Sequence, residues 1–225
     1  FYQNVLSSGT VPQISIISGP CAGGAAYSPA LTDFIIMVRG AKLFITGPAV
    51  VKQVTGEEIS AEGLGGADTH AATSGNIHFV ADSDEEAMAI AKKLLSFLPS
   101  NNMEDPPKAS DPGQIDLGEQ PELDTLIPDN PRQAYDMHEA IRMIVDNGDF
   151  LEVQEHWATS ILVGFARING SSVGIIANQP CVMAGVLDIN SSDKASQFIR
   201  FCNAFNIPLV TLVDVPGYLP GVAQE

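Results

Sequence analysis

The sequence is poor in basic residues. Lysine and arginine together number 11 among 225 residues, against 27 aspartates and glutamates, and the formal net charge is −16. Proteins that bind nucleic acid or an anionic membrane usually present a positively charged surface to the phosphates. The composition therefore argues against nucleic acid and against a membrane as partners.

Cysteine is scarce, and long hydrophobic runs are missing. Cys21, Cys181 and Cys202 are widely spaced and odd in number, which is typical of a reducing compartment rather than of a disulfide framework. No apolar run approaches the roughly 18 residues that a membrane-spanning helix needs. We therefore expect a globular protein of the cytoplasm, or of the mitochondrial matrix if the source is eukaryotic.

The spacings typical of metal sites and of nucleotide-binding loops are missing too. His70 and His78 flank a Thr-Ser-Gly turn, but no Cys, Asp or Glu at ligand spacing completes a metal set, so we expect no metal. Asp-Val-Pro-Gly at 214–217 matches an element of nucleotide hydrolases, yet the glycine-rich loop ending in Gly-Lys-Ser/Thr does not occur. This segment predicts a turn at the carboxyl end of a buried strand, where ligands bind in α/β folds.

The sequence does contain a glycine turn at 19–27, Gly-Pro-Cys-Ala-Gly-Gly-Ala-Ala-Tyr, directly after the apolar run 11–18. It predicts a strand that breaks at Gly-Pro and continues as an Ala-rich helix, whose first backbone N–H groups are unpaired. Gly23 and Gly24 would let a ligand approach the backbone closely. The turn predicts an anion or oxyanion site, the alternative being a tight turn in which glycine serves only packing.

Cys21 offers a second chemistry at the same turn. It lies between a strand and a helix, the topology of a nucleophile elbow, where a helix N-terminus would lower the pKa of its thiol. However, Gly-x-Cys-x-Gly spacing does not occur, and no base can be assigned among the four histidines. A Cys21-dependent thioesterase is a remote alternative, and a small buried residue is the simpler interpretation.

Strands and helices are expected in alternation. Apolar runs predict strands at 11–19, 34–38, 43–46, 77–81, 161–168, 173–178, 182–187 and 209–213. Caps and periodicity predict helices at 1–6, 48–54, 60–67, 132–145 and from Ser191 or Ser192 to 205. The clearest helix begins at 82–85, with one apolar face made of Ala87, Ile90, Ala91, Leu94, Leu95 and Leu98. Asn169-Gly170 predicts a tight hairpin, and the polar, Pro-rich segment 100–121 predicts the domain boundary.

Many of these segments resemble the carboxyltransferase (β) subunits of biotin-dependent acyl-CoA carboxylases, most closely those of the propionyl-CoA carboxylases. The resemblance covers nearly the whole chain. The segments that carry it are 11–34, 43–48, 64–67 with His70, 121–124, 163–167, 178–180, 187–192 and, most specifically, 205–209 with 214–221.

The resemblance implies a crotonase-like (ClpP/crotonase) α/β fold, a spiral of strand-strand-helix units, in parts of two fused halves. Residues 1–105 would form the C-terminal part of the N-terminal half, 106–125 a linker, and 126–225 the beginning of the C-terminal half. Because the chain starts at Phe1 within a helix and stops within a loop, we expect it to be a fragment.

The resemblance also implies an enzyme that moves a carboxyl group from N-carboxybiotin to the α-carbon of a short-chain acyl-CoA, through a thioester enolate. The catalytic residues would be Gly23 and Gly24, whose backbone N–H groups would hold the thioester oxygen. The residues expected to contact the substrate are Ala22, Ala25, Pro216 and Gly217.

Partners follow from the same resemblance. Biotin would be carried on a biotin carboxylase/biotin carboxyl carrier subunit, and the β subunits would form a homo-hexamer. The donors that serve biotin would lie beyond Glu225, so the isolated fragment is expected to be inactive. A biotin-dependent acyl-CoA decarboxylase or transcarboxylase of the methylmalonyl-CoA type is the alternative within the family.

Overall fold

The computed structural model of the chain describes residues 1–109, 121–130 and 133–224. They form two compact units, which are described separately. The first unit comprises Phe1–Ser96, Ser100–Asn102 and Gln154–Trp157, and the second comprises Phe97–Pro99, Met103–Val153 and Ala158–Glu225. The assignment of 1–105, 106–125 and 126–225 to two halves and a linker stays a prediction, and residues 110–120 of that linker lie outside the described residues.

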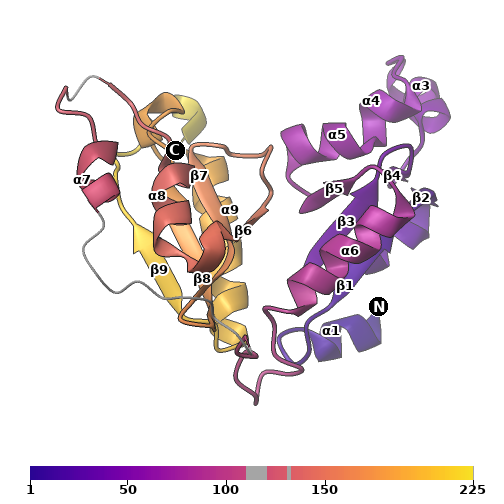
Figure 1. Ribbon diagram of the computed structural model, residues 1–225. Helices are drawn as coiled ribbons and strands as arrows, with labels where there is room; N and C mark the ends of the chain where they lie inside the picture. The colour runs from indigo at the N-terminus through magenta and orange to yellow at the C-terminus, as the bar shows by residue number, and fades with distance from the viewer. Residues whose placement is uncertain (110–120, 131–132, 225) are drawn as a thin grey trace. The chain divides into compact units, whose positions relative to one another are not determined.

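The first unit is built on a parallel sheet with the strand order β1-β3-β5 (Figure 1). Its strands are β1 (Ile14–Ile17), β3 (Phe34–Val38) and β5 (Phe79–Ala81). Every side chain of the central strand β3 is buried, as its unbroken apolar sequence predicts. The helix α6 (Asp84–Leu95) packs against β3 and β5, and Ser83 caps it by accepting a hydrogen bond from the Glu86 N–H.

A second, very small sheet carries the glycine turn. It pairs β2 (Pro20–Ala22) in parallel with β4 (Lys42–Phe44). A 3₁₀ turn at Gly23–Ala26 follows β2 directly and leads into α2 (Tyr27–Ala30). The other helices of this unit are α1 (Tyr2–Ser7), α3 (Pro48–Thr55), α4 (Ala61–Gly65), α5 (Ala67–Thr69) and a π-helix at His70–Ser74.

The second unit contains a four-stranded sheet with the order β6-β7-β8-β9, antiparallel except that β8 and β9 run parallel. The strands are β6 (Phe150–Val153), β7 (Ile161–Ile168), β8 (Ser171–Asn178) and β9 (Leu209–Leu212). The helices are α7 (Pro121–Leu126), α8 (Met137–Ile144) and α9 (Ile189–Ala204), besides short 3₁₀ turns at Asp146–Gly148, Met183–Gly185 and Val222–Gln224.

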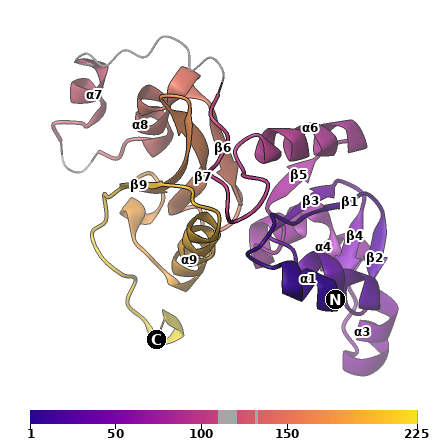
Figure 2. The same cartoon turned by 90° about the horizontal axis from the view of Figure 1, so that it is seen from below.

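Two helices cover the opposite faces of this sheet (Figures 1 and 2). On one face, Ile141 of α8 packs with Leu162 and Ile175. On the other, the ring of Phe198 of α9 lies 5.0 Å from that of Phe165. Alternate residues of β7 therefore point to two separate apolar layers, as the two-residue period of a strand requires.

Several sequence predictions are confirmed. The strand at 34–38 and the helix beginning at Pro48 are found, with Gly47 as the N-cap. Asn169 and Gly170 connect β7 to β8 with positive φ at both residues, which is the conformation that a two-residue hairpin turn needs. The α/β class is confirmed as well.

Other predictions are wrong in extent or in type. Residues 182–187 form a turn rather than a strand, and β6 was not predicted. The helix expected at 132–145 begins only at Met137, because Asp136 accepts the His138 N–H and caps it there; Arg132 lies outside the described residues. The cap of α9 is Asp188, not Ser191 or Ser192. Leu95 is exposed rather than on the buried face of α6.

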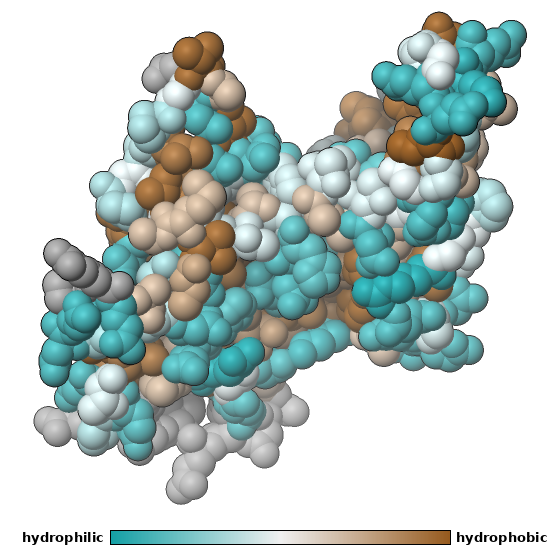
Figure 3. Space-filling view, turned by 90° about the horizontal axis from the view of Figure 1, so that it is seen from above, coloured by the Kyte–Doolittle hydropathy of each residue, from teal (hydrophilic) through white to brown (hydrophobic). Residues whose placement is uncertain are grey.

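Hydrophobic side chains stay exposed on both units, as the brown atoms of Figure 3 show. α1 and α3 bury none of their residues. The strongly exposed residues of the first unit include Phe1, Tyr2, Val5, Leu6, Ile45 and Val54, and those of the second include Met183, Val213, Tyr218 and Val222. Exposed apolar patches of this kind mark surfaces that bind partners or ligands. No helix in the described part of the chain is both long and apolar enough to cross a membrane.

Candidate functional site

The glycine pair of the glycine turn, Gly23 and Gly24, lies directly after the end of β2. Gly23 has φ +60°, a left-handed conformation that glycine adopts without the cost that a side chain would add. Gly24 and its neighbours Ala22 and Ala25 are exposed. A Cβ atom added at Gly24 would meet no other atom within 4 Å. The Gly24 α-carbon therefore faces open space in the first unit, on the side where a side chain would project.

The element that follows the turn differs from the one predicted. Instead of one Ala-rich helix starting at the Gly-Pro break, the chain forms the short strand β2, four residues of 3₁₀ helix and four residues of α-helix. A helix this short aligns few peptide dipoles, so its macrodipole contributes little. Any stabilisation of a negative oxygen at this place must come from the local amides of the turn.

The predicted contact residues of the second unit, Pro216 and Gly217, lie in the loop after β9. The Gly217 carbonyl accepts a hydrogen bond from the Leu187 N–H at 3.1 Å, and the Leu219 N–H donates to the Leu187 carbonyl at 2.8 Å. This bridge ties the loop after β9 to the loop after β8. The structure thus places Pro216 and Gly217 at the carboxyl ends of two parallel strands, where ligands bind in α/β sheets.

Asn178 orders the same two loops. Its side-chain amide donates to the Gly185 carbonyl at 3.0 Å, and its side-chain oxygen accepts the Asp214 N–H at 3.3 Å. Gly185 has φ +74°, and a Cβ there would lie 2.6 Å from the Asp214 carbonyl oxygen. Met183 and Ala184 also have positive φ, which is uncommon for residues with side chains. The sequence predicts none of these contacts, because they depend on how the loops after β8 and β9 fold over each other.

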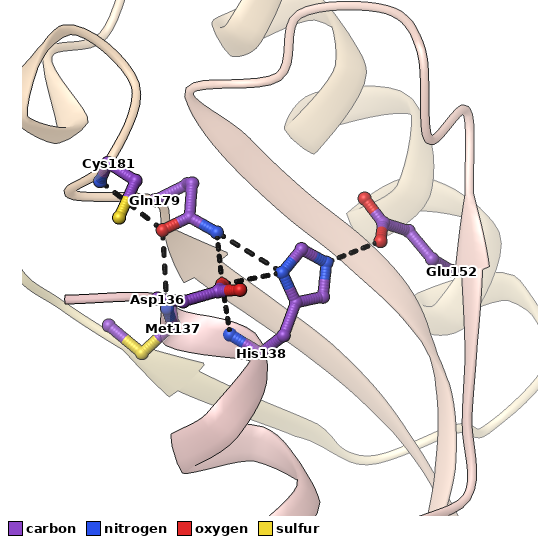
Figure 4. Close-up of polar contacts among 6 residues, drawn as sticks. All are labelled: Asp136, Met137, His138, Glu152, Gln179 and Cys181. Carbon is purple, nitrogen blue, oxygen red and sulfur yellow. Dashed lines mark hydrogen bonds and ion pairs between the residues drawn. The ribbon is translucent and has the colours of Figure 1, made fainter. Parts of the chain in front are cut away.

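A polar cluster lies beside these loops, at the start of α8 (Figure 4). The His138 imidazole lies between two carboxylates, with Nδ1 2.7 Å from Asp136 Oδ1 and Nε2 2.7 Å from Glu152 Oε2. Gln179 is buried next to it and donates to Asp136 Oδ1 at 2.7 Å. The side-chain oxygen Oε1 of Gln179 accepts hydrogen bonds from the backbone N–H groups of Met137 and Cys181. Gln179 therefore joins the end of β8 to the start of α8.

The two carboxylates change the protonation of the cluster. Burial alone would lower the pKa of His138, but the hydrogen bonds and charges of Glu152 and Asp136 outweigh it and raise that pKa. Burial likewise raises the pKa of Asp136, and its hydrogen bonds with Gln179 and His138 outweigh this and lower it. The cluster therefore favours an imidazolium between two carboxylates.

This arrangement predicts a pH dependence of stability. Because the pKa of His138 is raised in the folded state, His138 adds to the free energy of unfolding. This contribution is fully present below the unfolded pKa near 6.5 and is lost as the pH rises through the folded pKa. We expect about 0.5–1 kcal/mol, the scale of a partly exposed ion pair. Urea unfolding of the full-length subunit from pH 5.5 to 9 should show that the free energy of unfolding falls with rising pH, and His138→Gln should remove this fall. An identical fall in the variant would contradict this assignment.

Cys21 does not have the surroundings of a nucleophile. Burial raises the pKa of its thiol, so the thiol is less reactive than a free cysteine. Its side chain packs at the edge of the apolar core of the first unit, and no hydrogen-bond partner of the thiol is found within the described residues.

Cys181 and Cys202 are not in disulfides. The described ranges also contain no group of three or more His, Cys, Asp or Glu that could hold a metal ion.

Comparison with known proteins gives a consistent result. A sequence model of the family described as "Carboxyl transferase domain" matches residues 1–225. The chain is 59% identical over 225 residues to the methylmalonyl-CoA carboxyltransferase 12S subunit of Propionibacterium freudenreichii subsp. shermanii, covering 100% of this chain and 43% of the relative. It is 55% identical over 229 residues to the propionyl-CoA carboxylase beta chain of Roseobacter denitrificans, covering 100% of this chain and 44% of the relative. The chain thus spans less than half the length of these relatives.

The solved structures agree with the sequence comparison. The chain matches a crystal structure of transcarboxylase 12S with a TM-score of 0.96 and 59% identity, over 99% of this chain and 43% of that one. That structure is described as a hexamer assembly with hydrolyzed methylmalonyl-coenzyme A bound. The chain therefore has the fold of the carboxyltransferases, and this confirms the predicted crotonase-like α/β class.

Proposed function

We propose, from the premise that this chain belongs to the carboxyl transferase family, that the protein containing it carboxylates the α-carbon of a short-chain acyl-CoA, with propionyl-CoA as the preferred substrate. The observation that carries the proposal is the match to a propionyl-CoA carboxylase beta chain over all of this chain. N-carboxybiotin, carried by a partner, would supply the carboxyl group.

The glycine turn would hold the acyl-CoA. When the α-carbon loses its proton, negative charge moves to the thioester oxygen, and fixed backbone donors stabilise this charge without having to reorganise. Gly23 and Gly24 are proposed to donate their N–H groups to that oxygen, with Ala22 and Ala25 beside it. The open space at Gly24 supports this placement. Pro216 and Gly217 are proposed to line the pocket that the second unit contributes.

A second candidate function uses the same site. The transcarboxylase relative is 59% identical to the chain and the propionyl-CoA carboxylase beta chain is 55% identical. A transcarboxylase or decarboxylase would take the carboxyl group from a carboxylated acyl-CoA instead of adding it. The turn would serve either direction, because both pass through the same thioester enolate.

The proposed assembly follows from the relatives. We propose a homo-hexamer of the full-length subunit, since the 12S structure is described as a hexamer assembly, and a biotin carboxylase/biotin carboxyl carrier subunit as the partner. Exposed apolar side chains on both units fit a chain that is covered by other subunits. We propose a cytoplasmic location, or the mitochondrial matrix in a eukaryote, because the three cysteines are free.

One experiment separates the two functions. The full-length subunit is given its biotinylated partner with ATP, bicarbonate and either acetyl-, propionyl- or butyryl-CoA, and in a parallel assay methylmalonyl-CoA as the carboxyl donor. A carboxylase should require ATP and show its highest kcat/KM with propionyl-CoA. Any of these enzymes can pass the carboxyl group of methylmalonyl-CoA once to each biotin without ATP. ATP-independent consumption of methylmalonyl-CoA over many turnovers per biotin would therefore favour the transcarboxylase or decarboxylase. If neither assay showed turnover, both candidate functions would be contradicted.

A further inference from the structure

The glycine turn depends on a very weak sheet. β2 and β4 contain three residues each, and a two-stranded pair is marginally stable by itself. β4 has no second strand neighbour among the described residues. The register pairs Cys21 with Leu43 and Ala22 with Phe44, so the last pair of the ladder directly precedes Gly23. A small shift of β4 would therefore reach the turn.

The outer edge of β4 is held by a histidine. His70 Nε2 lies 2.6 Å from the Leu43 carbonyl oxygen. Because a carbonyl only accepts, Nε2 must carry the proton. The other ring nitrogen lies 2.9 Å from Ser74 Oγ, whose hydroxyl can donate to it. Both ring nitrogens are thus engaged, and they fix the tautomer and the orientation of the imidazole.

The segment 62–70, which includes His70, contacts β4 at its three residues, Lys42, Leu43 and Phe44. Lys42 forms an ion pair with Glu62. Gly65 approaches Leu43 so closely that a Cβ there would lie 2.3 Å from the Leu43 carbonyl oxygen and 2.6 Å from the Phe44 ring. His70 opens a π-helix, closed by a hydrogen bond from the Gly75 N–H to the His70 carbonyl at 2.9 Å. Single π turns occur often at functional sites.

We propose that His70 is a positioning residue, which fixes the amides of Gly23 and Gly24 by holding β4 through the Leu43 carbonyl; this inference rests on the function proposed for the glycine turn. His70 itself does not touch the substrate. Without its N–H, the Leu43 carbonyl at the edge of the sheet loses this hydrogen bond, and β4 loses a contact that holds it in place. Misplacing the groups of a catalytic site by about 1 Å can lower the rate about 10²-fold.

The test uses the full-length subunit in its complete carboxylation assay. His70→Leu is expected to lower kcat about 10- to 100-fold with the KM for acyl-CoA changed less than about twofold, because positioning matters most when charge develops on the oxygen. His70→Gln should recover most of kcat, because its amide can donate from nearly the position of Nε2. His70→Asn, with a shorter reach, should not. The exposed His156 provides the control, and His156→Leu should leave kcat unchanged.

A structural readout separates positioning from packing. Amide hydrogen exchange in His70→Asn should rise in β2 and β4 while the β1-β3-β5 sheet keeps its protection. Unchanged kcat in His70→Asn, absence of rescue by His70→Gln, or exchange that rises equally in both sheets would overturn the proposal. Wild-type protein without carboxyl transfer would instead contradict the proposed function, and the exchange comparison would still decide whether His70 holds β4.

Discussion

Gly24→Val in the full-length subunit is expected to lower carboxyl transfer about 10²- to 10³-fold, the scale of losing one oxyanion donor. A Cβ at Gly24 would meet no atom within 4 Å beyond its neighbours in the chain, so the fold should tolerate the added side chain. The substrate thioester would then meet the isopropyl group instead of the backbone. Gly24 is a sharper choice than Gly23, where the φ of +60° would add backbone strain to the loss of the site.

The matched control for this variant is Gly19→Val. Gly19 precedes β2 in the same unit, and a Cβ there also meets nothing within 4 Å. We expect unchanged turnover for Gly19→Val and unchanged thermal unfolding for both variants. If Gly24→Val turned over like the wild type, the turn would have to be a packing feature. If Gly24→Val unfolded at a lower temperature, its activity would not report on the substrate.

Gly75→Ala is expected to cost stability rather than activity, by about 3–4 kcal/mol. Gly75 has φ +64°, and its Cβ would lie 2.3 Å from the ring of Trp157. The left-handed backbone contributes about 1 kcal/mol, and forcing a methyl group into a packed site adds about 2–3 kcal/mol. Trp157 and Gln154 are both buried in the first unit, and the Gln154 side chain donates to the Gly75 carbonyl at 2.6 Å.

Gly56→Ala separates the two contributions. Gly56 ends α3 with φ +77°, close to the φ of Gly75, but a Cβ there meets nothing within 4 Å. It should therefore lose only about 1 kcal/mol. Urea unfolding of the two full-length variants, with hydrogen exchange of the peptides around 75 and 157, measures the difference. Equal losses in the two variants would show that the Trp157 contact carries no cost.

The fold was predictable from sequence where one local signal decided the structure. β3 is an unbroken apolar run, Pro48 fixes the start of α3, and Asn169-Gly170 fits the positive φ values of its hairpin. The run 182–187 is equally apolar, yet tertiary contacts decide it. Asn178 holds the Gly185 carbonyl, and the resulting turn prevents a strand there.

The candidate site was predictable only in part. The glycine turn is visible as a motif, and the apolar run 43–46 predicts a strand at β4, but β2 has only three residues and is too short for periodicity to reveal it. His70 belongs to a recognisable segment, whereas its partner is the backbone carbonyl of Leu43, which any residue would provide. The polar cluster around His138 forms because the sheet brings β6 and the end of β8 together. The spacing of residues in the sequence does not predict this strand register.

The most direct test of the central claim is the half-reaction between an acyl-CoA and free biotin, catalysed by the full-length subunit without its partner. Methylmalonyl-CoA labelled in its free carboxyl group is incubated with biotin, and label on biotin is measured together with the propionyl-CoA released. We predict that the label moves to biotin, about 10²- to 10³-fold more slowly in Gly24→Val and at the wild-type rate in Gly19→Val. Label that stays on the CoA thioester, or that moves equally fast in Gly24→Val, would contradict the account.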